Sequence, residues 1–123
     1  MATILAVDDE QSIRDILKMA LEDEGHEVTL ADGGRQAQDC ISKKSYNLII
    51  TDLIMPDIDG IAIIKFALKK NPNTRMITIT GGGKTDTEHY VKLAAELGVR
   101  KIVHKPFDLD QIIDAVNDVL GGQ

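Results

Sequence analysis

Residues 46–60 read YNLIITDLIMPDIDG, an apolar stretch that ends on Asp52 and then breaks at Pro56. The run NLIIT (47–51) is almost continuously apolar, as expected for a strand of a parallel sheet that is covered on both faces. An aspartate that ends such a strand is costly to bury unless another group pairs with it. The rest of the sequence must therefore supply a partner for Asp52.

Four more short apolar runs are expected to form strands, and segments with helical spacing separate them. In the first of these segments Ile13, Leu17 and Leu21 share one helix face, and Gly25 stands where the helix would stop. The expected strands are 3–7, 27–31, 47–51, 75–80 and 101–104, and the expected helices are 11–24, 34–42, 61–70, 86–97 and 108–120. The strict alternation predicts an α/β fold, a doubly wound parallel five-stranded sheet of the (βα)5 type, as one domain over residues 1–123.

Composition and charge argue against several classes of protein. The formal net charge of −6 and the absence of a basic run disfavour direct binding to nucleic acid, because phosphate contacts need a clustered cationic surface. No apolar run is long enough to cross a bilayer, and the start MATILAVDDE lacks the basic and small-residue signals of a secretory leader. Cys40 is the only cysteine, so no internal disulfide forms. We expect a cytoplasmic protein without membrane insertion.

Polar side chains follow four of the expected strands. Asp8 and Asp9 follow the first strand, Asp52 ends the third, Thr80 ends the fourth, and Lys105 follows the fifth. Open α/β sheets bind ligands at the carboxyl ends of their strands, so we expect these groups to converge. Clustered carboxylates repel one another, and a divalent cation with oxygen ligands relieves that repulsion.

Mg²⁺ fits such a site best, because it accepts a few carboxylates and leaves a coordination position for a phosphate oxygen. Asp52 would then be a carboxylate nucleophile able to form an aspartyl-phosphate. Lys105 and the Thr80 hydroxyl would stabilise the charge on the transferred phosphoryl oxygens.

The motifs VDDE, IITDLIMPDIDG, TIT followed by glycines, and HKPF stand in an order and at separations that resemble those of a response-regulator receiver domain of two-component signalling. The resemblance covers essentially the whole chain and implies the flavodoxin-like strand order 2-1-3-4-5. It implies that Asp52 is the phosphorylation site, Thr80 the hydroxyl switch residue and Lys105 the phosphate-pairing lysine. It also implies a cis peptide bond between Lys105 and Pro106.

The same resemblance implies a metal site and partners. Asp9 would ligate Mg²⁺ directly and Asp8 largely through water, with Asp52 and the Ile54 carbonyl as further ligands. The donor of the phosphoryl group would be a histidine kinase or a histidine phosphotransfer protein, and the phosphorylated domain would act on a downstream protein target. The chain would thus be a signalling phospho-acceptor rather than an enzyme acting on other substrates.

One position departs from the family pattern, and two others bear on the lifetime of the phosphoryl group. Ile102 stands where receivers commonly carry an aromatic switch residue, so we expect the loop 81–87, with Gly81, Gly82 and Gly83, to respond to phosphorylation through Thr80. The family tunes phosphate lifetime through the residues two after the aspartate and two after the threonine, here Ile54 and Gly82. An apolar Ile54 cannot orient an attacking water, which predicts slow self-dephosphorylation, although Gly82 leaves that side open to solvent.

Other interpretations stay open at this point. A Mg²⁺-dependent phosphatase working through an aspartyl-phosphate would typically carry an acid at position 54, where this chain has Ile54. A receiver-like binding module that is never phosphorylated is the other alternative. In the turn before the third helix, Asp57 and Asp59 are expected to shape the helix start, and Gly60 to relieve backbone strain.

Overall fold

The computed structural model describes residues 1–56, 58–81 and 87–121. Strands and helices alternate along the chain as the sequence predicts. The elements are β1 (Thr3–Val7), α1 (Gln11–Asp23), β2 (Glu27–Ala31), α2 (Gly34–Lys43), β3 (Leu48–Asp52), α3 (Gly60–Lys70), β4 (Arg75–Gly81), α4 (Thr87–Glu96), β5 (Lys101–Lys105) and α5 (Leu109–Gly121). The predicted strands agree with the observed ones to within one residue at each end.

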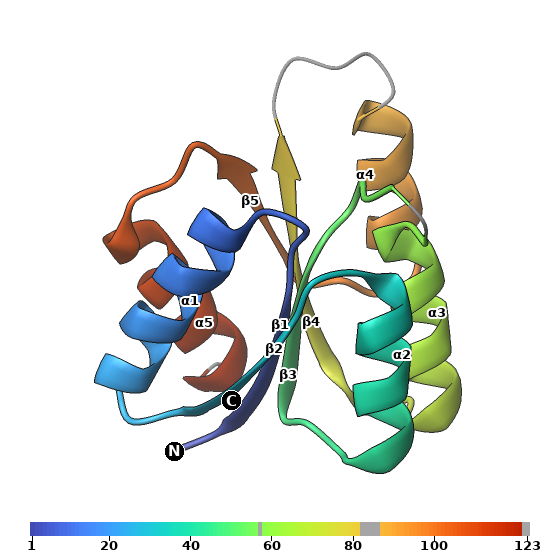
Figure 1. Ribbon diagram of the computed structural model, residues 1–123. Coiled ribbons are helices and arrows are strands. Elements are labelled where there is room, and N and C mark those ends of the chain that lie inside the picture. The colour runs from blue at the N-terminus through green and yellow to red at the C-terminus, as the bar shows by residue number, and fades with distance from the viewer. Residues whose placement is uncertain (57, 82–86, 122–123) are drawn as a thin grey trace.

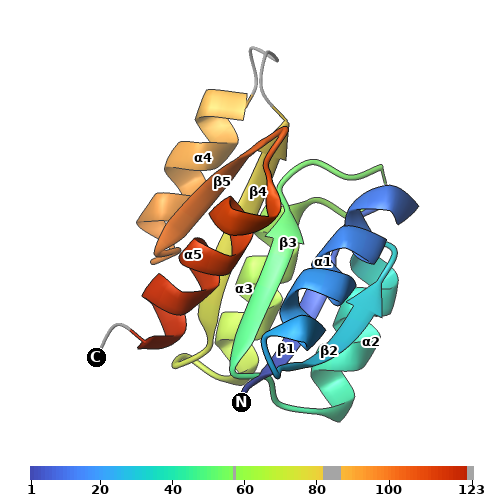
Figure 2. The same cartoon turned by 90° about the vertical axis from the view of Figure 1, so that its left-hand side faces the viewer.

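The five strands form one parallel sheet in the order β2-β1-β3-β4-β5, which confirms the predicted topology. Helices α1 and α5 cover one face of the sheet, and α2, α3 and α4 cover the other (Figures 1 and 2). Within the described part of the chain, no helix has the length and apolar character needed to cross a bilayer.

The two layers explain why the strands are apolar along their whole length. In β1 the side chains of Ile4 and Ala6 join the core on the α1 and α5 side, whereas Leu5 and Val7 join the core on the other side. All four are fully buried. Successive strand residues point to opposite faces, so a sheet with helices on both faces needs an apolar residue at every position.

The turn between β3 and α3 places the start of α3 against β3. The Asp59 carboxylate accepts a hydrogen bond from the Ala62 N–H at 2.9 Å and so caps α3, as predicted. Asp57 lies outside the described residues. The prediction that Gly60 relieves backbone strain was wrong. Among the described glycines only Gly25 and Gly98 have a positive φ angle. Gly60 is required by close packing instead.

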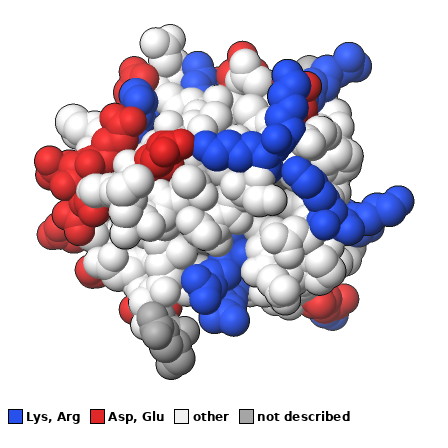
Figure 3. Space-filling view, turned by 90° about the horizontal axis from the view of Figure 1, so that it is seen from below, with Lys and Arg blue, Asp and Glu red and all other residues white. Residues whose placement is uncertain are grey.

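Charge is unevenly distributed at the amino ends of the strands. Figure 3 shows acidic side chains gathered mainly along one edge of this face, and lysine and arginine side chains scattered over the remainder, most of which is uncharged. The sequence has no basic run, yet folding brings the ends of α2 and α3 together (Figure 1) and with them their exposed lysines. Lys43 and Lys44 are paired with Asp39 and Glu27, and Lys70 donates to the carbonyls of Ile41 and Lys44. These lysines therefore lie at the carboxyl ends of α2 and α3, where the helix dipole favours positive charge.

Candidate functional site

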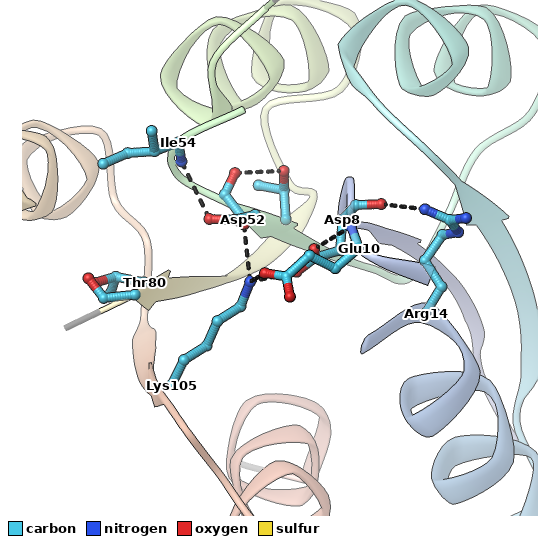
Figure 4. Close-up of polar contacts among 9 residues, drawn as sticks. Asp8, Glu10, Arg14, Asp52, Ile54, Thr80 and Lys105 are labelled. Atoms are coloured by element: carbon cyan, nitrogen blue, oxygen red, sulfur yellow. Dashed lines mark hydrogen bonds and ion pairs between the residues drawn. The ribbon is translucent and has the colours of Figure 1, made fainter. Parts of the chain in front are cut away.

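The polar strand ends meet at the carboxyl edge of the sheet. β3 lies between β1 and β4, and β5 pairs with β4, so four strand ends are neighbours. Asp52 aligns with Ile79 of β4, and Thr80 of β4 aligns with His104 of β5. Figure 4 shows the side chains of Asp8, Asp52 and Lys105 directed toward one another. The topology alone therefore assembles residues that are far apart in the sequence.

The Lys105 ammonium is the centre of the cluster. Its Nζ lies 3.1 Å from Asp52 Oδ2, 3.1 Å from Asp8 Oδ2 and 3.0 Å from Glu10 Oε1. The Lys105 side chain is 15% exposed, Asp8 is fully buried and Asp52 is 5% exposed. One cation thus contacts three carboxylates, two of which are buried.

Burial disfavours the charge on both buried acids. Burial raises the pKa of Asp8 from 3.8 to about 6. The hydrogen bond from the Glu10 N–H lowers this pKa, and the negative charge of Asp52 raises it further. Burial also raises the pKa of Asp52, although the Ile54 N–H and Lys105 oppose the shift. A single lysine therefore does not fully offset the effect of burial on these two carboxylates.

At Lys105 the neighbouring carboxylates affect the pKa more strongly than burial does. Burial by itself lowers the pKa of an ammonium, but hydrogen bonds to Glu10 and Asp52 and the charges of Asp52 and Asp8 outweigh it, so the pKa of Lys105 is raised. The lysine is therefore charged throughout the physiological pH range.

One oxygen of Asp8 lacks a hydrogen-bond donor. Asp8 Oδ1 accepts from the Glu10 N–H at 2.9 Å, but Oδ2 is buried and its contact with Lys105 is a close ion pair rather than an aligned hydrogen bond. Buried acceptors without donors are rare and costly. Ligand atoms of Asp8, Asp9 and Glu10 lie within 4.8 Å of one another, so this corner has the oxygen ligands that a metal ion requires.

The remaining predicted site residues differ in their exposure. Asp9 is exposed, and Ile54 donates its N–H to Asp52 Oδ1 at 3.2 Å. Thr80 is 1% exposed, and its hydroxyl lies 3.5 Å from the Gly81 carbonyl. The predicted responsive loop, with Gly82 and Gly83, falls almost entirely on residues 82–86, outside the described part of the chain.

Two residues of the site were missed by the sequence analysis. Glu10 contacts Lys105, and the guanidinium of Arg14 donates to the Asp8 carbonyl at 2.9 Å. Glu10 directly follows Asp8 and Asp9 in the motif VDDE, and this position could have indicated that it belongs to the site. Arg14 lies one helical turn further along α1, and no motif indicated it.

Replacing Asp8 by asparagine is expected to stabilise the metal-free chain by about 1–2 kcal/mol at pH 7. Asparagine has the same shape and keeps an oxygen for the Glu10 N–H, but it carries no charge to desolvate. Lys105 keeps Asp52 and Glu10 as partners, so no unpaired charge is left behind. Urea unfolding in EDTA measures the difference, and the exposed Asp23→Asn, at the end of α1, is the matched control.

The stabilisation by Asp8→Asn depends on pH. Because folding raises the pKa of Asp8 from 3.8 to about 6, the native chain is favoured by protonation of this group below pH about 4 and loses that stabilisation as the pH rises through 6. The advantage of the asparagine variant should therefore vanish near pH 4 and be complete above pH 7. An asparagine variant less stable than the native chain at pH 7 would show that the ion pair outweighs burial.

Comparison with known proteins agrees with this geometry. The family described as "Response regulator receiver domain" matches residues 4–117. The chain is 37% identical over 117 residues to the sporulation initiation phosphotransferase F of Bacillus subtilis, covering 95% of this chain and 92% of that protein. It is 33% identical to a probable transcriptional regulatory protein of Picosynechococcus sp., covering 91% of this chain but 46% of that longer protein. The structure of the Vibrio cholerae chemotaxis protein CheY4 superposes with a TM-score of 0.86 at 28% identity, covering 98% of this chain and 99% of that one.

Proposed function

The chain belongs to the family of response regulator receiver domains, and on that premise we propose that residues 1–123 form a receiver domain that accepts a phosphoryl group on Asp52 in a Mg²⁺-dependent reaction. The observation that carries the proposal is the Asp52 carboxylate, held at the end of β3 beside Asp8 and Lys105. Receiver domains of two-component systems take their phosphoryl group from a histidine kinase or a histidine phosphotransfer protein and pass the signal to a downstream protein. We propose the same partners for this chain, in the cytoplasm.

The residues present fit a magnesium ion. Asp8 offers a buried oxygen whose one described partner is the Lys105 ammonium, and Asp9 is exposed beside it. Asp52 and the Ile54 carbonyl complete the proposed ligand set. When bound, Mg²⁺ would neutralise these acids and the negative charge that gathers on the transferred phosphoryl group.

Each protein group then has a defined part in the transfer. A carboxylate oxygen of Asp52 attacks the phosphorus in line, the bond from phosphorus to the donor imidazole nitrogen breaks, and its electron pair leaves with the imidazole. The Ile54 N–H, which already donates to Asp52 Oδ1, fixes the orientation of the nucleophile. Lys105 moves from the carboxylate to a phosphoryl oxygen, and the Thr80 hydroxyl, on the neighbouring strand, donates to another.

The apolar side chain at position 54 bears on the lifetime of the phosphoryl group. Ile54 offers no side-chain group to activate water or protonate a leaving group. This supports a signalling phospho-acceptor over a phosphatase, and slow self-dephosphorylation stays a prediction. Gly82, the other residue invoked for phosphate lifetime, lies outside the described residues.

Incubation with acetyl phosphate and Mg²⁺ tests the proposal by intact mass. We expect the mass of one phosphoryl group to be gained with Mg²⁺, and no gain when EDTA replaces the metal. No gain from acetyl phosphate, together with none from a histidine-phosphorylated donor protein, would favour the binding module that is never phosphorylated. Sustained turnover of a phosphate ester would favour the phosphatase instead.

A further inference from the structure

Glu10 occupies an unusual place between the acidic strand end and Lys105. It is the residue that precedes α1, where a side chain commonly caps the free N–H groups of the helix, but its side chain makes no capping hydrogen bond. The carboxylate instead lies 3.0 Å from Lys105 Nζ, on a residue 95 positions away in the sequence. Its backbone N–H holds Asp8 Oδ1 at 2.9 Å. Glu10 therefore contacts Asp8 through its backbone and Lys105 through its side chain (Figure 4).

The three carboxylates on Lys105 are not equivalent. The oxygens of Asp8 and Asp52 that face the ammonium are buried, whereas the Glu10 side chain is 57% exposed at the mouth of the site. A divalent cation bound by the two aspartates would repel an ammonium that sits 3.1 Å from each of them. Glu10 is the partner left to Lys105 under those conditions, because its exposed carboxylate is not one of the two that would hold the cation.

We propose that Glu10 is a positioning residue for phosphorylation, holding the Lys105 ammonium at the mouth of the site while the buried aspartates are occupied by the cation. The lysine is then in place to receive the incoming phosphoryl oxygens instead of moving into solvent. This proposal rests on the proposed function of Asp52. It assigns a role in the reaction to a residue outside the set Asp8, Asp9, Asp52, Ile54, Thr80 and Lys105.

Glu10 has one competing role, that of a metal ligand. Its carboxylate lies close enough to those of Asp8 and Asp9 to share an ion with them. The two roles differ in what the loss of the carboxylate changes. Loss of a ligand weakens Mg²⁺ binding about tenfold or more, whereas loss of the lysine partner slows the transfer and leaves Mg²⁺ binding within about twofold.

The variant Glu10→Gln separates these roles, because glutamine keeps the length of the side chain without the charge. The control is Asp15→Asn, which removes the same charge from an exposed position of α1 that is described in no ion pair. With acetyl phosphate at saturating Mg²⁺, we expect phosphorylation of Glu10→Gln to be about fivefold slower than that of the control. In a Lys105→Met background the same substitution should change the rate by less than about twofold.

A second measurement needs neither metal nor phosphorylation. In EDTA, an amine-acylating reagent followed by peptide mapping reports how firmly Lys105 is held, with the exposed Lys65 as internal reference. Loss of the Glu10 carboxylate removes the contact at the exposed end of the site, so that only the two aspartates hold the ammonium. We expect the acylation rate of Lys105, relative to Lys65, to rise about threefold or more in Glu10→Gln and to stay unchanged in Asp15→Asn.

The proposal is overturned by a phosphorylation rate equal to that of the Asp15→Asn control, by a tenfold loss of Mg²⁺ affinity, or by an equal effect of Glu10→Gln with and without Lys105. If the native chain took up no phosphoryl group, the proposed function would fail on its own. The acylation rates would still decide whether Glu10 holds Lys105, and unchanged rates would contradict that.

Discussion

Replacing Asp52 by asparagine is expected to lower phosphoryl uptake about 100-fold or more, to below detection by intact mass. Asparagine preserves the shape of the side chain and an oxygen that can accept from the Ile54 N–H, but an amide oxygen is a poor nucleophile toward phosphorus. Lys105 keeps Asp8 and Glu10 as partners, so the sheet edge should stay folded. The expected loss is therefore one of chemistry and not of structure.

The control for Asp52→Asn is again Asp23→Asn, which removes one exposed carboxylate far from the cluster. It should take up phosphate at the native rate. Thermal or urea unfolding of Asp52→Asn should show stability equal to or above that of the native chain, because burial raises the pKa of Asp52 and so opposes its charge. Phosphoryl uptake at the native level by a folded Asp52→Asn chain would mean that another residue is the acceptor.

Replacing Gly60 by alanine is expected to destabilise the chain by about 3 kcal/mol. A Cβ at this position would lie 2.3 Å from the Asp52 carbonyl oxygen and 2.7 Å from the Leu53 Cα, both of them backbone atoms that a side-chain rotation cannot move. The Gly60 N–H also donates to the Leu53 carbonyl at 2.8 Å, so α3 cannot shift away without losing that bond. Urea unfolding followed by circular dichroism measures the loss.

Gly121→Ala provides the matched control, since a Cβ at Gly121 meets nothing within 4 Å. It should lie within about 0.5 kcal/mol of the native stability. Because the clash of Gly60→Ala falls on the backbone of Asp52 itself, the variant should also accept phosphate more slowly. A Gly60→Ala chain as stable as the Gly121→Ala chain would show that β3 and α3 separate more easily than their contact indicates.

The bounds of the strands were the part of the fold that could be predicted best from the sequence. A residue such as Leu5 or Ile50 is buried by layers on both faces of the sheet, and the resulting apolar runs give bounds that agree with β1, β2 and β5 closely. The convergence of Asp8, Asp52 and Lys105 followed from the same topology, because parallel strands end at one edge. The cis bond between Lys105 and Pro106 was expected from the family resemblance alone, and the structure confirms it.

Side-chain contacts between distant segments could not be predicted in this way. The pairing of Glu10 with Lys105 depends on the rotamer of a long side chain next to a helix start, which no periodicity encodes. The role of Gly60 was likewise misread, because its cause is a backbone contact with β3 rather than a turn that needs positive φ. Ile102 is half-buried on β5, and a readout through the loop after Thr80 stays a prediction.

Chemical localisation of the phosphoryl group tests whether Asp52 is the acceptor. After phosphorylation with acetyl phosphate and Mg²⁺, borohydride reduces an aspartyl-phosphate to homoserine, and tandem mass spectrometry of the digested chain locates the changed residue. We expect homoserine at position 52, and only when Mg²⁺ is present during phosphorylation. Homoserine at position 8 or 9, or a phosphoryl group that resists borohydride and remains on a hydroxyl such as that of Thr80, would contradict it.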